Sequence, residues 1–387
     1  MRRPGYWALE ERLGAPLPMT SGVSRPLGSS LPPSAGPPAG LGARLADVSV
    51  DRAASAAQVV LEASRMVRDW LAGRPEDEVR GPALEKELAE FAAGQGWRGP
   101  CALWLDSLRR TVAFADALER PARDALEEEL GAWLVDEERS FDDELCERVI
   151  REKAPLDPVP WNGEPFASGR RLPSRGALAR RASGIGIDRG DTILVTAWSE
   201  SVALALEMAW RAGKDPAVCL PEGLPDLDGR RMARRLSRAG VAVTLVYDSA
   251  VLSLVPRVDR VWLSTEAIGA GAFLARAGTR ALIEECARRD VPVRVLATSD
   301  KLVPGGRLEL PGWAEREGWR LWEDAPEGVR LESQFYETVP TALLELVGGF
   351  LTEIGPEAVA AMHVRALRVE AAPVLDRRAS PGLHVRA

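Results

Sequence analysis

Four charged side chains in the second half of the chain follow short apolar runs that predict strands. Two are carboxylates, Asp248 and Glu266, and two are cations, Arg276 and Lys301. The carboxyl ends of parallel strands share one edge of a sheet, so residues distant in sequence meet there. Cations suit a phosphate group and carboxylates suit hydroxyl groups. We therefore predict that these four side chains converge on one pocket for a small phosphorylated polyol.

Four further residues of the strand-end loops are candidates for ligand binding: Ser199, Glu222, Gly278 and Thr279. The charged residues also have structural alternatives, which stay open at this point. Asp248 can cap the helix expected from Ser249, a use that aspartate favours. Glu266, Arg276 and Lys301 can be solvated surface charges.

Other common kinds of site have little support in the sequence. The four cysteines form no C-x-x-C pair and the chain has only two histidines, so a Cys/His zinc site is not expected. Both histidines stand near the C-terminus, which argues against a Ser-His-Asp triad. No glycine-rich phosphate-loop fingerprint opens a helix after a predicted strand. We expect neither a metal nor a cofactor.

Net charge and hydropathy limit which binding partners and which cellular compartment we expect. A net charge of −7 and a pI of about 5.3 argue against binding to nucleic acids or anionic membranes through bulk charge. The N-terminus lacks the apolar stretch of a signal peptide, and no apolar run approaches the ~20 residues of a membrane span. The spacing of the cysteines suggests free thiols in a reducing compartment. We expect a cytoplasmic protein.

Composition divides the first half of the chain into three segments. Residues 1–46 are expected to be a disordered arm, because they are rich in Pro, Gly and Ser. Residues 47–154 place apolar side chains at helical spacing, which predicts a helical domain. Residues 155–190 are expected to be a linker, since closely spaced prolines oppose a regular helix. Its basic pairs at 170–171 and 180–181 are either a phosphate-binding arm or a solvated loop.

Residues 191–365 alternate short β-branched runs with helical segments, and residues 366–387 form a tail. Strands are expected at 193–196, 217–220, 241–246, 261–263 and 293–297, with helices between them. This alternation predicts an α/β domain with a mostly parallel, Rossmann-like sheet. Ligands of such sheets bind beyond the carboxyl ends of the strands.

The strand-end loops carry a series of short motifs. In chain order they are Thr196, Ser199–Val202, Glu222, Pro225, Gly229–Ala233, Asp248–Ala250, Glu266–Ile268, Gly278, Thr279 and Ser299–Lys301, followed by Thr338–Pro340 and Thr352–Gly355. In this order and spacing they resemble the family of initiation factor 2B α, β and δ subunits. That family also contains methylthioribose-1-phosphate isomerase and ribose-1,5-bisphosphate isomerase. The resemblance covers roughly Asp47 to Gly355.

The resemblance implies a helical N-terminal domain, a Rossmann-like C-terminal domain and dimers or higher oligomers. The family's enzymes convert aldose phosphates to ketose phosphates, with a cysteine and an aspartate as the acid/base pair. In this chain Ala197 stands at the cysteine position and cannot exchange a proton. Leu224 replaces an arginine of a phosphate loop, and Glu266 replaces the aspartate with a carboxylate displaced by roughly 1 Å. Arg276 and Lys301 keep positive charge near the expected ligand.

Two hypotheses remain open. The first is a non-catalytic, binding or regulatory member of the initiation factor 2B-like group, with a pocket for a sugar phosphate or a nucleotide. The second is a divergent aldose–ketose sugar-phosphate isomerase with Glu266 and Asp248 as its catalytic residues. Ala197 and Leu224 favour the first, because they remove two groups that the family chemistry needs.

Two apolar features have alternative interpretations. The run from Ala342 to Val347, with the resemblance, suggests a homodimer; the alternative is a helix of the intramolecular core. Trp198, beside the lost cysteine position, either fills the place of a sugar or packs against the helix expected from Ser201.

Overall fold

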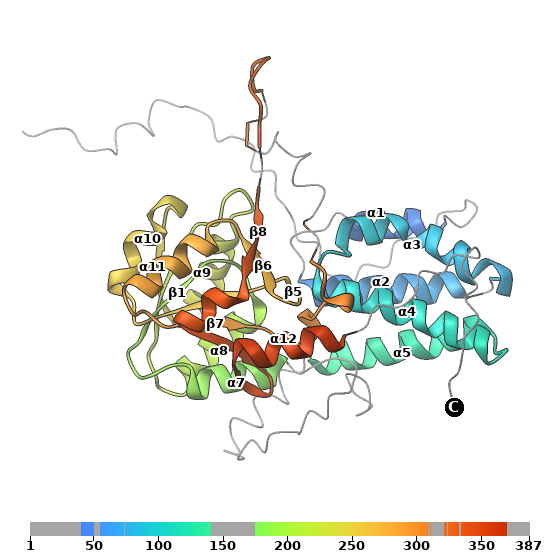
Figure 1. Ribbon diagram of the computed structural model, residues 1–387, viewed down its shortest axis with the longest axis horizontal. Coiled ribbons are helices and arrows are strands. Elements are labelled where there is room, and N and C mark those ends of the chain that lie inside the picture. The colour runs from blue at the N-terminus through green and yellow to red at the C-terminus, as the bar shows by residue number, and fades with distance from the viewer. Residues whose placement is uncertain are drawn as a thin grey trace, which may run out of the picture. The chain divides into compact units, whose positions relative to one another are not determined.

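The computed structural model describes residues 40–49, 55–72, 74–140, 175–308, 310, 321–322, 324–332 and 334–369. Of residues 135–140 only the backbone is described. Figure 1 shows the first part of the chain in blue to cyan as a group of helices, and the second part in green to red as a sheet with helices. Within the described ranges, no helix is long and apolar enough to cross a membrane.

The first part is built from long amphipathic helices. They are α1 (Leu41–Ser49), α2 (Ala56–Leu71), α3 (Gly81–Gln95), α4 (Gly99–Ala117) and α5 (Ala122–Ser140), with a short 3₁₀ helix η3 (Glu76–Glu78) before α3. A capping box begins α2: the Ser55 hydroxyl accepts a hydrogen bond from the Gln58 N–H, and the Gln58 side chain accepts one from the Ser55 N–H. The apolar faces enclose one core that contains Phe91 and Trp104, whose ring centroids lie 5.1 Å apart.

The second part contains a seven-stranded sheet. Five of its strands were expected from the sequence, and the strands at 348–352 and 355–357 were not. Its strands are β1 (Thr192–Val195), β2 (Ala217–Pro221), β3 (Ala242–Val246), β4 (Arg260–Ser264), β7 (Val293–Leu296), β9 (Gly348–Thr352) and β10 (Gly355–Glu357). The order is β10-β9-β7-β4-β1-β2-β3, and every neighbouring pair is parallel except β9 and β10. The expected fold class, a helical region followed by a mostly parallel α/β sheet, is confirmed.

Helices cover both faces of this sheet. They are α7 (Arg175–Ile185), α8 (Glu200–Arg211), α9 (Asp228–Arg238), α10 (Val251–Leu254), α11 (Thr279–Arg288) and α12 (Val359–Arg368). Alternate residues of a strand point to opposite faces. Accordingly Ile193 and Val195 pack in the core under α7, α8 and α9, whereas Leu194 packs in the core under α10, α11 and α12.

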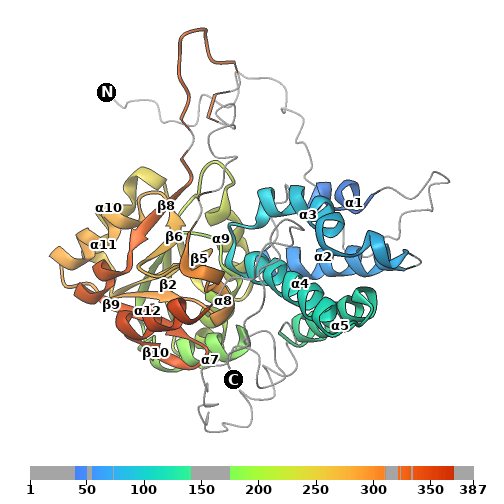
Figure 2. The ribbon, with the colours of Figure 1, turned by 45° about the vertical axis from the view of Figure 1, so that its right-hand side comes forward.

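A smaller antiparallel sheet follows β4 in the chain and was not expected from the sequence. It consists of β5 (Ala267–Ile268), β6 (Ala272–Arg276) and β8 (Tyr336–Pro340), in the order β5-β6-β8 (Figure 2). Short 3₁₀ helices complete the part: η4 (Asp248–Ala250), η5 (Val255–Arg257), η6 (Ser299–Lys301), η7 (Pro304–Gly306) and η9 (Thr341–Leu346). These 3₁₀ helices are too short for hydrophobic periodicity in the sequence to reveal them.

The strand order places a switch point beside β1. From β1 the chain builds the sheet outward through β2 and β3, and it then returns to add β4, β7 and β9 on the other side. The loops after β1 and β4 therefore run to opposite sides and leave a crevice at the carboxyl ends of these strands. This geometry determines where a ligand site is expected.

Two of the expected segments differ from the structure. The first helix, α1, begins at Leu41, inside the range 1–46 expected to be disordered; residues 1–39 lie outside the described residues. The helix α7 lies inside the range 155–190 expected to lack regular helix. It forms because the prolines end before it, and because Leu178 and Ala182 are fully buried against the sheet.

The C-terminal expectations are described only in part. The apolar run 342–347 lies mostly in η9, where Leu344 is fully buried and Leu346 is 71% exposed. The basic pair at 170–171 and residues 370–387 lie outside the described residues. Arg181 of the second basic pair donates its Nε–H to the Glu353 carbonyl at 2.6 Å, which is a structural contact between α7 and the turn after β9.

Candidate functional site

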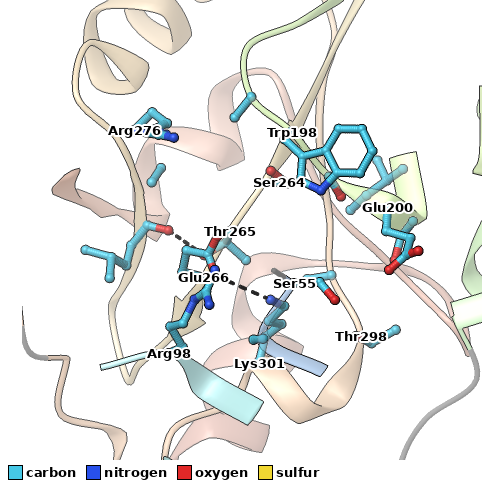
Figure 3. A pocket seen from close by; sticks show the side chains of 18 of the residues that line it. Ser55, Arg98, Trp198, Glu200, Ser264, Thr265, Glu266, Arg276, Thr298 and Lys301 are labelled. Carbon is cyan, nitrogen blue, oxygen red and sulfur yellow. Dashed lines mark hydrogen bonds and ion pairs between the residues drawn. The ribbon is translucent and has the colours of Figure 1, made fainter. Parts of the chain in front are cut away.

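A cavity opens at the switch point, beyond the carboxyl ends of β1, β4 and β7. Its walls include the loop 196–201 after β1, the residues 264–266 at the end of β4 and the residues 296–298 at the end of β7. The water-accessible volume is about 80 Å³. That exceeds several-fold the roughly 10–15 Å³ that one water needs. The site therefore has room for a small polar group, and Figure 3 shows its principal side chains.

The helical region supplies two further walls, both of them helix starts. Ser55 and the first residues of α2 line the cavity, as does Arg98, the N-cap of α4. The first N–H groups of a helix have no partner within the helix, and the helix dipole favours an anion beside them. The α2 terminus thus presents an anion-attracting surface to the cavity.

The start of α4 is fastened directly to the site. The Gly99 N–H donates to the carbonyl oxygen of Glu266 at 2.8 Å. A Cβ atom on Gly99 would lie 2.6 Å from the Cα of Lys301, so glycine is required for this approach. The helical region and the sheet together therefore place Arg98, Glu266 and Lys301 side by side.

Glu266 lies between two cations. Its Oε2 is 3.3 Å from the Nε of Arg98 and 3.8 Å from the Nζ of Lys301, and both side chains reach toward it in Figure 3. Burial by itself would raise the pKa of Glu266, but the charges of Arg98, Lys301 and Arg276 outweigh burial and hold this pKa below its usual value. Glu266 in this setting is a stable carboxylate and a weak base.

Arg276 stands on the other side of the same wall, at the end of β6. It pairs with Asp228 and, at 3.5 Å, with Asp226, and its guanidinium lies 5.1 Å from the centre of the Tyr336 ring. Burial works against its charge, but Tyr336 and the two aspartates keep the pKa of Arg276 above its usual value. Burial raises the pKa of Tyr336 to about 12, so its hydroxyl stays protonated and can donate a hydrogen bond.

A fourth cation, Arg175, begins α7. Its Nη2 is 3.3 Å from the Asp300 carboxylate, which is 1% exposed and also accepts a hydrogen bond from the Thr298 hydroxyl. Arg175 and Thr298 both line the cavity. The residues of this wall are therefore held in place by a buried network before any ligand arrives.

The loop after β1 forms the remaining wall. Ser199 caps α8, since its hydroxyl accepts a hydrogen bond from the Val202 N–H at 3.4 Å. Ala197 lines the cavity at the position where the resemblance places a cysteine. Trp198 both lines the cavity and packs against the core of α7, α8 and α9, and Arg231 of α9 lies 3.9 Å from the centre of its ring. The packing of Trp198 against α8 is thus observed, and the same side chain also forms part of the cavity wall.

Asp248 lies apart from this group, in a neighbouring hollow of about 430 Å³ beyond β2 and β3. Its carboxylate accepts hydrogen bonds from the Gly223 N–H at 3.1 Å and the Leu224 N–H at 3.2 Å. We call this region the outer hollow. The expectation that Asp248 shares one pocket with Glu266 is not met, because β3 is an edge strand and β4 lies on the far side of β1.

The other candidates divide between these regions. Gly278 and Thr279, at the start of α11, line the outer hollow, and the Thr279 hydroxyl donates to the Arg276 carbonyl at 2.6 Å. Glu222 is 8% exposed, and its carboxylate pairs with Arg230 at 2.6 Å, so it serves the loop between β2 and α9. Arg276 lines both the cavity and the outer hollow.

Several side chains of the cavity were not anticipated from the sequence. Arg98, Arg175, Tyr336 and Asp228 all line it. Arg98 and Arg175 begin helices outside the predicted sheet, so the strand-end rule could not find them. The Ser-x-x-Gln pattern at Ser55 is a readable start of a helix, but it does not reveal what that helix faces.

Comparison with known proteins shows which families and proteins the chain is similar to. Residues 176–356 match the model of the Initiation factor 2 subunit family. This segment, slightly less than half of the chain, is therefore similar to that family. It is 30% identical to a ribose 1,5-bisphosphate isomerase of Haloferax volcanii over 59% of the chain and 64% of the relative. It is 34% identical to translation initiation factor eIF2B subunit beta of Dictyostelium discoideum over 30% of each chain. The chain thus spans less than two thirds of these relatives.

Solved structures show the same fold. The crystal structure of translation initiation factor eIF-2B from Pyrococcus horikoshii OT3 matches with a TM-score of 0.58 and 17% identity, over 82% of this chain and 96% of that one. A tetrameric eIF2B-beta2-delta2 complex from C. thermophilum contains a chain that matches with a TM-score of 0.54 and 15% identity, over 84% of this chain and 93% of that one.

Proposed function

We propose that this protein binds a sugar phosphate or a nucleotide in the cavity at the switch point and does not isomerise it. The proposal depends on two features of the cavity taken together, its positively charged lining and the identity of residue 197. Four cations and the starts of four helices line the cavity, while Ala197 occupies the position of the family's acid/base cysteine. The site thus has what phosphate binding requires and lacks one partner of the proton transfer.

The anion end of the site is the side of Lys301, Arg98 and the α2 start. The Lys301 ammonium is only loosely paired with Glu266 at 3.8 Å, so it can turn to a phosphate oxygen without breaking a short contact. Arg98 is buried and held in place. Its guanidinium therefore attracts a phosphate electrostatically and loses little side-chain conformational entropy when the phosphate binds. Helix N–H groups add donors for the phosphate oxygens.

The sugar end is the side of Trp198 and Glu200. The Trp198 Nε1–H and the Glu200 Oε2 are buried on this wall and have no hydrogen-bond partner among the described residues. Figure 3 shows both side chains across the cavity from Arg98. Buried polar atoms left without a partner are costly. A ligand with hydroxyl groups would satisfy this donor and this acceptor together.

The protonation of Glu266 supports binding over catalysis. A general base works best with a pKa near the working pH. The cations around Glu266 lower its pKa instead, so it is a poor proton acceptor at neutral pH. Tyr336, with its pKa raised to about 12, donates a hydrogen bond and does not act as a base.

The second candidate function is a divergent aldose–ketose isomerase. The names of the Haloferax volcanii relative and of a Methanocaldococcus jannaschii relative, both ribose 1,5-bisphosphate isomerases, favour it. In that case Glu266 carries the proton between the two carbons. Asp248 would need to reach the same ligand from the outer hollow, and its present bonds to Gly223 and Leu224 oppose that movement.

Assembly is part of the proposal. The related chain from C. thermophilum was solved in a tetrameric complex, and β3 here is an exposed edge strand with Leu245 43% and Tyr247 75% exposed beside it. An exposed apolar edge suits pairing with a second chain. We expect a homo-oligomer. Light scattering that returns a 41.9 kDa particle at micromolar concentration contradicts it.

The binding experiment is a thermal-shift and calorimetric titration with ribose 1,5-bisphosphate, ribose 5-phosphate and a nucleoside monophosphate. A ligand that binds only the folded state raises the midpoint with the logarithm of its concentration. We expect a saturable shift with at least one of these ligands, weakened at least tenfold in Lys301→Gln. Arg280→Gln, an exposed arginine of α11 that pairs with Glu284 at 3.0 Å, is the control. The absence of any saturable shift overturns the proposal.

A further inference from the structure

One helix on the surface of the α/β part is unusually basic. The helix α9 carries arginine at five of its eleven positions: Arg230, Arg231, Arg234, Arg235 and Arg238. Three pairs of these arginines are separated by four residues, so like charges face each other along the helix. Each such pair destabilises a helix by roughly 0.2–0.5 kcal/mol. The chain as a whole has a net charge of −7, so this concentration of positive charge is local. The overall composition of the chain does not explain it.

The arginines of α9 border a groove together with α8. Its lining consists of Arg211, Arg231, Arg234, Arg235, Arg238, Glu207, Ala239 and Trp198. We call this the arginine groove. Its volume is about 480 Å³, within the roughly 300–1,000 Å³ of small-molecule sites. The lining contains five guanidinium groups and one carboxylate, and a second carboxylate, Glu200, lies 3.9 Å from Arg235.

Two of the arginines are already fixed. Arg235 makes a two-pronged contact with Glu207, with Nε to Oε1 at 2.6 Å and Nη2 to Oε2 at 3.2 Å. The guanidinium carbon of Arg231 lies over the Trp198 ring, 3.9 Å from its centre. Fixed guanidinium groups lose little rotamer freedom on binding an anion. This part of the groove is therefore prepared for a ligand.

The other end of the groove carries uncompensated charge. Arg234 and Arg238 are exposed and make no hydrogen bond or ion pair within the described ranges. Basic residues in the last turn stabilise a helix through its dipole, which explains Arg235 and Arg238. It does not explain Arg231 and Arg234, which precede that turn. A solvated face alone would also not gather five arginines around one groove.

We propose that the arginine groove binds a compact polyphosphate anion. Residues 231 to 238 span roughly 10 Å of helix at 1.5 Å per residue, which suits two or three linked phosphates in contact with several guanidinium groups. A small ligand fits better than a nucleic acid, because the acidic chain as a whole repels a long polyanion. Linked phosphates, inorganic or on a nucleoside, share this chemistry.

This second anion site does not depend on the function of the cavity. The two sites share one wall residue, Trp198, which lines both. A polyphosphate that draws Arg231 off the indole changes the environment of that ring. Trp198 therefore gives a direct optical signal of occupation, isolated from the other tryptophans by comparison with Trp198→Phe.

The test is a titration of the full chain with inorganic tripolyphosphate, by calorimetry and by tryptophan fluorescence at low salt. We expect saturable binding that weakens at least tenfold in the double variant Arg234→Gln/Arg238→Gln and weakens with added salt. The matched control is Arg288→Gln/Arg289→Gln, which removes two exposed charges from the end of α11 and stays within twofold. Lys301→Gln, in the cavity, also retains the binding.

Four results overturn the proposal. The first is no saturable binding by the wild-type chain. The second is equal loss in the two double variants, which makes the effect one of net charge. The third is loss in Lys301→Gln with retention in Arg234→Gln/Arg238→Gln, which assigns the binding to the cavity. A single-stranded RNA that binds the groove more tightly than tripolyphosphate also defeats the assignment to a compact ligand.

Discussion

The cavity and the outer hollow are neighbours at the same edge of one sheet, yet their carboxylates are placed in opposite ways. Glu266 in the cavity faces the cations Arg98 and Lys301 at 3.3 and 3.8 Å. Asp248 in the outer hollow faces two backbone N–H groups at 3.1 and 3.2 Å. Both regions are lined by Arg276, so they differ in side chains contributed from elsewhere and not in access to the sheet.

The difference lies in which elements reach each region. The cavity stands at the switch point and receives helix starts from α2, α4, α7 and α8. The outer hollow is bordered by the edge of the sheet and by α10 and α11. Position at a strand end is therefore not sufficient for a binding side chain. The charges that converge from other elements decide whether a carboxylate serves a ligand or its own loop.

The largest expected effect comes from removing Arg98. In Arg98→Ala, Glu266 loses its buried partner and keeps only Lys301, and breaking a buried pair costs about 3 kcal/mol of unfolding free energy. Ligand binding in the cavity should fall below detection. Urea unfolding and calorimetry measure the two effects.

The control for this change is Arg109→Ala. Like Arg98, Arg109 pairs with a glutamate, but through two contacts, to Glu85 at 2.7 and 3.1 Å, between α3 and α4 and away from the cavity. This pair is partly exposed, so its loss should cost about 1 kcal/mol or less and leave ligand binding unchanged. Equal destabilisation by the two variants would contradict a special role for Arg98.

A pair of smaller changes separates the two carboxylates. Glu266→Gln should weaken cavity binding about tenfold, because a charged hydrogen-bond partner contributes about 1.5–3 kcal/mol. Asp248→Asn should cost about 1 kcal/mol of stability, like a lost cap, and leave the dissociation constant within twofold. Calorimetric titration of both variants decides the matter. If Asp248→Asn weakens binding as much as Glu266→Gln, the cavity and the outer hollow form one site.

The smallest effect is a dependence on pH. The folded-state pKa of Glu266 lies below its usual value of 4.5, so its ionised form stabilises the fold. This contribution is complete above pH ~4.5 and is lost as the pH falls through the lowered pKa, with a slope of at most about 1.4 kcal/mol per pH unit. The stability difference between wild type and Glu266→Gln should stay constant from pH 7 to pH 5 and shrink below. A difference that grows on acidification has the wrong sign for this ion pair.

The sequence predicted the architecture better than the order of its parts. Strands such as 193–196 and helices such as 279–288 follow from local periodicity, and the parallel sheet follows from their alternation. Strand order does not, because nothing local places β1 between β4 and β2. The strand β8 was missed for a related reason, since it pairs with β6, a segment distant in the sequence. The strands β5 and β6 form a local hairpin, which the sequence analysis also missed.

The site was predicted in part for the same reason. Glu266, Arg276 and Lys301 line one cavity, because each follows a strand beside the switch point or pairs into its wall. Asp248 follows the edge strand, and its place in the outer hollow depends on strand order. Arg98 reaches the site only because the start of α4 docks against Lys301 at Gly99, a contact between segments that no pattern connects.

The most direct test of the central claim is a search for turnover with the binding-competent protein. Wild-type protein at micromolar concentration is incubated with ribose 1,5-bisphosphate and followed by ¹³C and ³¹P NMR for several hours, with calorimetry on the same sample. The proposal predicts saturable binding and no ketose product. Formation of the ketose bisphosphate by wild type, abolished in Glu266→Gln but unchanged in Arg109→Ala, would contradict it and establish the chain as an isomerase.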